Sequence, residues 1–244
     1  MNDRMIPLNK KEVLRYLGYK RGQELTGDID QIVEEMMIEV QKVSNARYLY
    51  QIFDIEADEE LQVIRVVDTD LVLTGKSIWR HLHQAQKVAL LGCTLGIEVE
   101  QVIRRYEITD LTRGMILDCA CTEYIEKICD LAECDIAAAI SEKAADEGQA
   151  AQQRTPGYTL NQRFSPGYGD LPLAIQPTFI RTLQADTRLG ITLTETNLMI
   201  PRKSVTAVIG LFADPTEAKP RRKGNYCNVC DFRECNFRIG GTKG

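Results

Sequence analysis

The residues with the clearest chemical potential lie in one stretch, NQRFSPGYGDLPL, at positions 161–173. Arg163 carries a permanent charge on a planar fork that can hold a carboxylate through two hydrogen bonds. Pro166 and Gly167 favour a type II turn, because proline fixes φ at the second position and glycine accepts a positive φ at the third. Gly167 also lets a flat ligand approach the backbone, and Tyr168 adds a flat apolar face with a polar tip. These residues suit a small ligand with a carboxylate and a planar ring, although a purely structural turn fits them too.

Three cysteines near the C-terminus form a second group. Cys227, Cys230 and Cys235 follow the spacing Cys-x-x-Cys-x-x-x-x-Cys, and the first pair has the spacing of a metal knuckle. Three thiolates bind zinc or an iron–sulfur cluster well. We expect a metal here, with Asp231, another chain or an exogenous group as the fourth ligand. A reduced cysteine tail without metal is the alternative.

The composition limits the class of protein. The chain has 244 residues, of which 44% are hydrophobic, enough to bury a sizeable core. A net charge of −5 argues against a general nucleic-acid binder. No window resembles a membrane span or a signal peptide, so we expect a cytoplasmic protein. A reducing compartment disfavours disulfides, and five cysteines are predicted to be small core residues: Cys93, Cys119, Cys121, Cys129 and Cys134.

The pattern of apolar residues predicts alternating helices and strands. Helices are expected at 9–19, 29–43, 76–86, 96–106, 111–132 with a continuation beyond 134, and 174–185. Strands are expected at 46–56 and 61–68, which form a hairpin, and at 70–75, 87–96, 190–201 and 203–214. Thr94 is expected to cap the helix at 96–106.

The helix that starts at 111 is predicted to be buried nearly all round, with Asp110 as its cap. Two apolar faces support this expectation, one formed by Leu117, Cys121, Ile125, Ile128 and Ala132 and the other by Leu111, Met115 and Cys119. Glu123 lies in line with Cys119 and Ile116. It could point into the protein or, as most such acids do, into solvent at the helix edge.

The segment Arg163-x-x-Pro166-Gly167-Tyr168 resembles the Arg-Pro-Ala-Pro-Gly-Tyr signature of the activation domain of cobalamin-dependent methionine synthase. Residues 116–133 resemble the long helix before that signature. Residues 189–215 resemble the family's Gly-x-x-Leu-Thr-Glu-Ser segment and the Pro-x-x-Ser-Val strand that follows it, and EVLRYLGYK near the start resembles short stand-alone relatives. The resemblance, clearest over 85–215, implies an α/β fold with a mixed, largely antiparallel sheet flanked by helices. We assign this domain to residues 1–215 and a basic, cysteine-containing tail to residues 216–244.

The resemblance implies S-adenosylmethionine as the ligand. Arg163 would bind the ligand's carboxylate, the backbone of Pro166 and Gly167 would pass close to the ligand, and Tyr168 would form one side of its pocket. Glu123 matches the family's helix glutamate, which takes an amine or hydroxyl of the ligand, with Glu126 one turn away as the alternative.

The chain also departs from the family pattern. Gly169, Asp170, Leu171 and Pro172 stand where the family has a second proline, a cysteine and an acid. The family's N-terminal ligand aspartate and late tyrosine pair have no counterpart. No Asp-x-His-x-x-Gly occurs, and His81 and His83 are expected to face different ways, so the usual lower ligand of cobalamin is missing. These 244 residues are also too few for the homocysteine and folate modules, so we do not expect a complete methionine synthase.

The implied role is that of a methyltransferase component in methionine biosynthesis. It would support reductive methylation of a corrinoid, with cobalamin on a partner protein and an electron donor such as flavodoxin or ferredoxin. We expect no nucleic-acid or membrane partner. Two alternatives stay open: a non-catalytic module that binds a corrinoid protein, and a redox protein whose metal-bearing tail delivers the electron.

Overall fold

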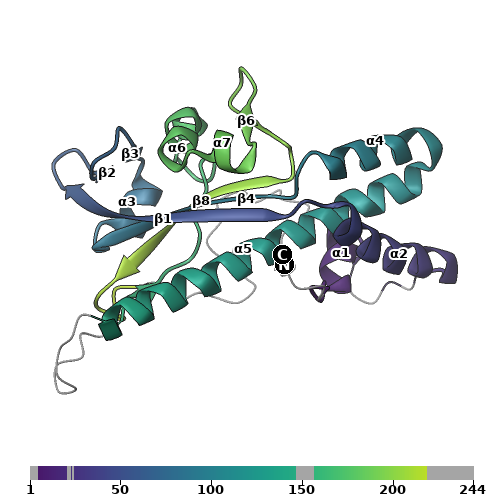
Figure 1. Cartoon of the computed structure of the whole chain (residues 1–244), viewed down its shortest axis with the longest axis horizontal. Helices are drawn as coiled ribbons and strands as arrows, with labels where there is room; N and C mark the ends of the chain where they lie inside the picture. The colour runs from purple at the N-terminus through teal and green to yellow at the C-terminus, as the bar shows by residue number, and fades with distance from the viewer. Residues whose placement is uncertain (1–4, 21–22, 24, 147–156, 219–244) are drawn as a thin grey trace, which may run out of the picture.

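The computed structural model describes residues 5–20, 23, 25–146 and 157–218 (Figure 1). Its helices are α1 (Lys10–Tyr16), α2 (Gly27–Val43), α3 (Lys76–Leu82), α4 (Glu98–Thr109), α5 (Leu111–Asp146), α6 (Gln176–Leu183) and α7 (Ala185–Leu189). Its strands are β1 (Arg47–Asp58), β2 (Val63–Val66), β3 (Val72–Thr74), β4 (Lys87–Thr94), β5 (Thr159–Leu160), β6 (Thr192–Leu193), β7 (Met199–Ile200) and β8 (Ser204–Phe212).

Six strands form one antiparallel sheet in the order β3-β2-β1-β4-β8-β5, and β6 and β7 form a separate small hairpin. The helices α1, α2 and α5 lie on one side of the sheet, and α6 and α7 lie on the other (Figure 1). The predicted mixed α/β fold is therefore confirmed.

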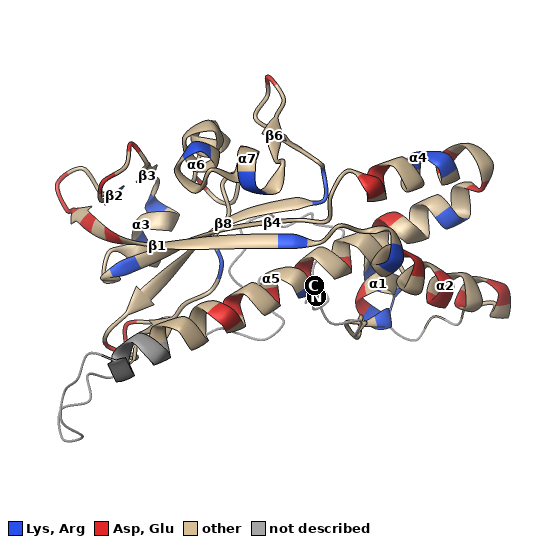
Figure 2. Ribbon diagram, viewed as in Figure 1, with Lys and Arg blue, Asp and Glu red and all other residues tan. Residues whose placement is uncertain are grey.

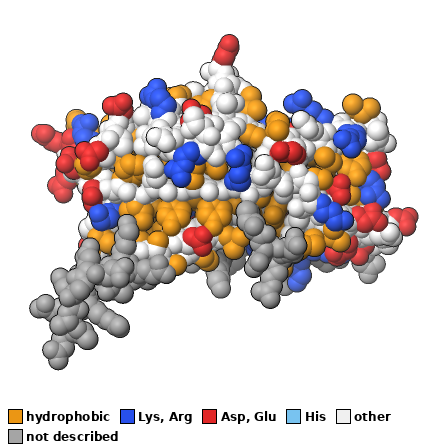
Figure 3. Space-filling model, viewed as in Figure 1, with side chains coloured by type: hydrophobic (Ala, Val, Ile, Leu, Met, Phe, Trp, Pro, Cys, Tyr) orange, Lys and Arg blue, Asp and Glu red, His pale blue; other side chains and the backbone are white. Residues whose placement is uncertain are grey.

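Each face of the sheet packs on its own hydrophobic core. Alternate residues of a strand point to opposite faces, and β4 is buried on both: Ala89 and Leu91 belong to the core under α5, while Val88 and Leu90 belong to the core under α6 and α7. Figure 3 shows a row of hydrophobic side chains along β1 on its α5 side. Tyr48, Tyr50 and Ile52 of β1 pack there as partly buried residues.

Two expectations about helix ends have different outcomes. Asp110 does cap α5, because its Oδ1 accepts a hydrogen bond from Arg113 N at 3.1 Å. Thr94 does not cap α4. It lies at the end of β4, where its Oγ1 accepts hydrogen bonds from Gly96 N and Ser204 Oγ, and α4 begins two residues after Gly96 with Ile97 at the N-cap.

The apolar stripe predicted from Leu117 to Ala132 is buried, but the second stripe is not. Leu111 is 61% exposed and Met115 is 57% exposed. The helices α4 and α1 contact the first turns of α5 but leave these two side chains in solvent. The cysteine prediction is partly wrong as well. Cys93, Cys121 and Cys129 are buried, whereas Cys119 is half-buried and Cys134 is exposed.

None of the helices among the described residues has the length and apolar character that crossing a membrane requires.

Candidate functional site

The Pro166–Gly167 turn forms as the sequence predicts. Tyr168 N donates to Ser165 O at 3.1 Å, which closes the four-residue turn, and Gly167 has a φ of +89°. A side chain at that position would be strained, since this region of φ favours glycine. Gly167 N also donates to Leu171 O at 2.9 Å. Tyr168 is therefore 66% exposed on a backbone that is fixed by hydrogen bonds within residues 165–171.

Two neighbouring elements fix the ends of this turn. Phe164 exchanges backbone hydrogen bonds with Val208 of β8, at 2.9 and 2.8 Å. Asp170 accepts hydrogen bonds from Lys76 N at 2.7 Å and Ser77 N at 2.9 Å, which places a carboxylate at the N-terminus of α3. These donors, Ser77 N first, lower the pKa of Asp170. Asp170, where the sequence departs from the family signature, thus attaches the turn to α3.

Arg163 contacts three carboxylates on α5. Its guanidinium donates to Glu126 at 2.8 Å, to Asp130 at 3.1 Å and to Glu133. The three acids share one face of the helix because they are spaced four and three residues apart. Figure 2 shows acidic positions along α5 beneath the sheet.

The acids around Arg163 differ in exposure. The side chain of Glu133 is 5% exposed and that of Arg163 is 12% exposed, while Glu126 and Asp130 are 45% and 41% exposed. An Arg–Glu pair at this burial needs both members, because an uncompensated charge in the interior is costly. Water can hydrate Glu126 and Asp130 if they leave the guanidinium.

Glu123 is buried, as one of the two sequence interpretations proposed, but it faces α1. Its side chain accepts a hydrogen bond from Asn9 N at 3.1 Å and lies 3.5 Å from Lys127 Nζ. Burial raises the pKa of Glu123, against the opposing effect of the Asn9 N–H. The structure thus gathers Arg163, buried Pro166, Gly167 and Tyr168 on one turn, and Glu126 rather than Glu123 is hydrogen-bonded to its arginine.

The two histidines, which were expected to face different ways, contact different residues. His81 Nε2 lies 2.7 Å from Gln162 O, and its ring packs against Phe164, so it supports the turn. The ring of His83 stacks on Trp79.

The predicted cysteine ligands Cys227, Cys230 and Cys235 lie outside the described residues. Within the ranges that the structure describes, no group of three or more His, Cys, Asp or Glu side chains could hold a metal ion.

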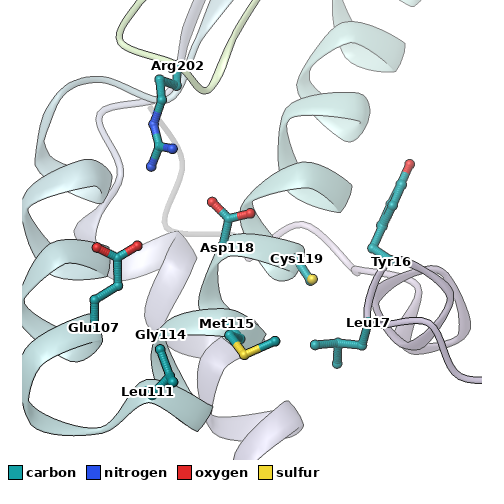
Figure 4. Close-up of a pocket in the computed structure, with 9 residues that line it drawn as sticks. All are labelled: Tyr16, Leu17, Glu107, Leu111, Gly114, Met115, Asp118, Cys119 and Arg202. Atoms are coloured by element: carbon teal, nitrogen blue, oxygen red, sulfur yellow. The ribbon is translucent and has the colours of Figure 1, made fainter.

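A second concave feature, missed by the sequence reasoning, lies between α1 and the first turns of α5. It is a hollow of about 330 Å³ (Figure 4). Its lining residues come from four segments and comprise Tyr16, Leu17, Glu107, Leu111, Gly114, Met115, Asp118, Cys119 and Arg202. A Cβ on Gly114 would lie 3.1 Å from the Glu107 backbone nitrogen, so glycine permits the close packing of α4 on α5 beside the hollow. The apolar residues Leu111 and Met115 could have indicated this hollow from the sequence, but their spacing fits a buried stripe equally well.

The fold is similar to that of a solved reactivation domain. In this chain six antiparallel strands carry a long helix on one face, and Phe164, next to Arg163, pairs with β8. One similar solved structure is the MetH reactivation domain, crystallised bound to AdoHcy, with a TM-score of 0.59 and 15% identity. The match covers 84% of this chain and 77% of that domain, and at this identity it establishes the fold alone. No protein-family model and no curated protein matches the chain.

Proposed function

We propose that this protein binds S-adenosylmethionine at the turn of residues 163–168 and supports reductive methylation of a corrinoid held by a partner protein. The observation that carries the proposal is the fold shared with a reactivation domain bound to AdoHcy, which is S-adenosylmethionine without its transferable methyl group. The closed turn, with a positive φ at Gly167 and an exposed Tyr168 ring, supports the same ligand.

The ligand's carboxylate takes the place of an exposed acid on Arg163. Glu126 and Asp130 can move into water, while the buried Glu133 keeps its contact with the guanidinium. Arginine suits this exchange because its fork binds carboxylates in a fixed geometry. The ring of Tyr168 offers a flat face for the planar part of the ligand.

The partner's corrinoid is a substrate of the proposed reaction. One electron from a donor such as flavodoxin or ferredoxin reduces the oxidised cobalt, which then attacks the sulfonium methyl group. A cobalt–carbon bond forms, the sulfur–carbon bond breaks, and S-adenosylhomocysteine leaves. The chain supplies no acid or base in this step. It contributes the orientation of the methyl group toward the metal, an effect of proximity.

A methyl-transfer assay tests the proposal. Protein, a separate corrinoid protein, a one-electron reductant and methyl-labelled S-adenosylmethionine should give labelled methylcobalt and an equal amount of S-adenosylhomocysteine. The chain alone should give neither product. Turnover of homocysteine by the isolated chain would contradict this assignment.

One observation favours a second candidate, a non-catalytic module that binds a corrinoid protein. Arg163 already contacts three carboxylates, so its charge is compensated without a ligand. In this alternative the turn is a structural element, and the chain associates with the corrinoid protein without needing the nucleoside. The two functions differ in one measurable property, the binding of S-adenosylmethionine by the chain itself.

A further inference from the structure

The hollow between α1 and α5 is divided into a charged half and an apolar half (Figure 4). The charged ends of Arg202, Glu107 and Asp118 turn toward one another on one side. Leu17, Leu111 and Met115 form the other side. Its volume of about 330 Å³ is at the lower end of the range of about 300–1,000 Å³ for small-molecule sites.

The charges in the polar half are unequally compensated. Asp118 is paired with Lys203, whose Nζ lies 3.0 Å from its Oδ1. Among the described residues Glu107 forms no ion pair. Glu100 accepts a hydrogen bond from Arg202 N, but its carboxylate lies 4.0 Å from the guanidinium Nε of Arg202, whose side chain is 60% exposed. One carboxylate and one guanidinium thus face the hollow, with Asp118 and its lysine between α5 and the β7–β8 loop.

The apolar half leaves two large hydrophobic side chains in contact with solvent. Leu111 and Met115 are both more than half exposed, although they belong to a helix that is buried farther along. Cys119 adds a neutral thiol, since burial raises its pKa to about 11. Covering these side chains with an apolar group would remove them from water, which is favourable.

We propose that this hollow binds a free α-amino acid with an apolar side chain, with the ammonium group on Glu107, the carboxylate on Arg202 and the side chain against Leu111, Met115 and Leu17. The ammonium and carboxylate groups on one carbon of the ligand match the opposite charges of Glu107 and Arg202 on one wall. A simple amine would leave Arg202 without an anion, and a simple acid would leave Glu107 without a cation. Binding of an amino acid in this hollow does not require S-adenosylmethionine at the turn.

Three probes with the same apolar side chain separate these contributions. L-Leucine should bind the full-length protein saturably, as followed by amide chemical-shift changes at Gly114, Met115 and Arg202. 4-Methylpentanoate lacks the ammonium group and 3-methylbutylamine lacks the carboxylate, so each should bind about 10-fold to 100-fold more weakly. The amides of Gly167 and Tyr168 should not shift, which distinguishes this site from the turn.

Two variants and a control assign the contacts. Arg202→Gln should weaken the binding of L-leucine by about tenfold or more and leave the affinity for 3-methylbutylamine unchanged. Glu107→Gln should weaken the binding of L-leucine and leave the affinity for 4-methylpentanoate unchanged. Arg105→Gln removes a charge from the exposed face of α4 outside the hollow and should change nothing. All three substitutions are at exposed positions, and unchanged thermal unfolding checks that each variant is folded.

Absence of saturable shifts with L-leucine would overturn the proposal. Equal affinity for all three probes would also overturn it, because the hollow would then be a non-selective apolar surface. Binding that survives both Arg202→Gln and Glu107→Gln would place the ligand elsewhere.

Discussion

Replacing Arg163 by methionine should destabilise the protein strongly, because it leaves the carboxylate of Glu133 buried without its cation. The Glu133 side chain is 5% exposed, so the cost approaches the value of about 3–5 kcal/mol for breaking a buried ion pair. The lost ion pairs with Glu126 and Asp130 add little to this destabilisation, since both side chains are more than 40% exposed and exposed pairs contribute about 1 kcal/mol or less.

Thermal and urea unfolding measured by circular dichroism provide the assay. For a chain of this size the loss corresponds to a fall in Tm of about 6–20 °C. The matched control Glu126→Gln removes an exposed partner from the same arginine and should lower stability by about 1 kcal/mol or less. Adding Glu133→Met to Arg163→Met should restore most of the loss, because an apolar replacement of both partners removes the unpaired charge.

A cost of less than about 1 kcal/mol for Arg163→Met, the value for a surface pair, would contradict a buried and unpaired Glu133. No recovery of stability on adding Glu133→Met would also contradict it, because the loss would then come from something other than the unpaired carboxylate.

Three further predictions concern other parts of the chain. Asp170→Ala should cost about 0.5–2 kcal/mol of unfolding free energy at pH 7 through loss of the α3 cap. Because the folded state lowers the pKa of Asp170, this difference in stability should shrink as pH falls below about 4. A difference that stays constant with pH would contradict this prediction. Glu123→Gln should leave the protein as stable or more stable at pH 7. Burial raises the pKa of Glu123, so its ionised form destabilises the folded state, and this cost grows as pH rises above about 4. At pH 3 the variant and the wild type should have the same unfolding free energy. The tail should hold zinc or an iron–sulfur cluster at Cys227, Cys230 and Cys235, and elemental analysis that finds less than about a tenth of an equivalent of transition metal would leave these cysteines without that role.

The turn could be predicted from sequence because its geometry follows from local rules. Proline followed by glycine defines the backbone angles of residues 165–168 almost independently of the remaining chain. The helices and the main strands follow from periodicity for the same reason, and Asp110 caps α5 as its position suggested.

The partners of Arg163 could not be predicted, since they lie 30 to 37 residues earlier in the chain. The row of acids on α5 is visible in the sequence, but the fold determines which cation meets it. The exposure of Leu111 and Met115 has a similar origin. Periodicity identifies the apolar faces of a helix, and the path of neighbouring helices determines which of them are covered.

Calorimetric titration of the full-length protein with S-adenosylmethionine and S-adenosylhomocysteine tests the central claim most directly. We predict saturable binding of both at one site per chain, weakened several-fold by Tyr168→Ala without a change in Tm, since that ring is 66% exposed. Failure to detect heat or thermal stabilisation at millimolar ligand, with the protein folded, would contradict the account and favour the non-catalytic module.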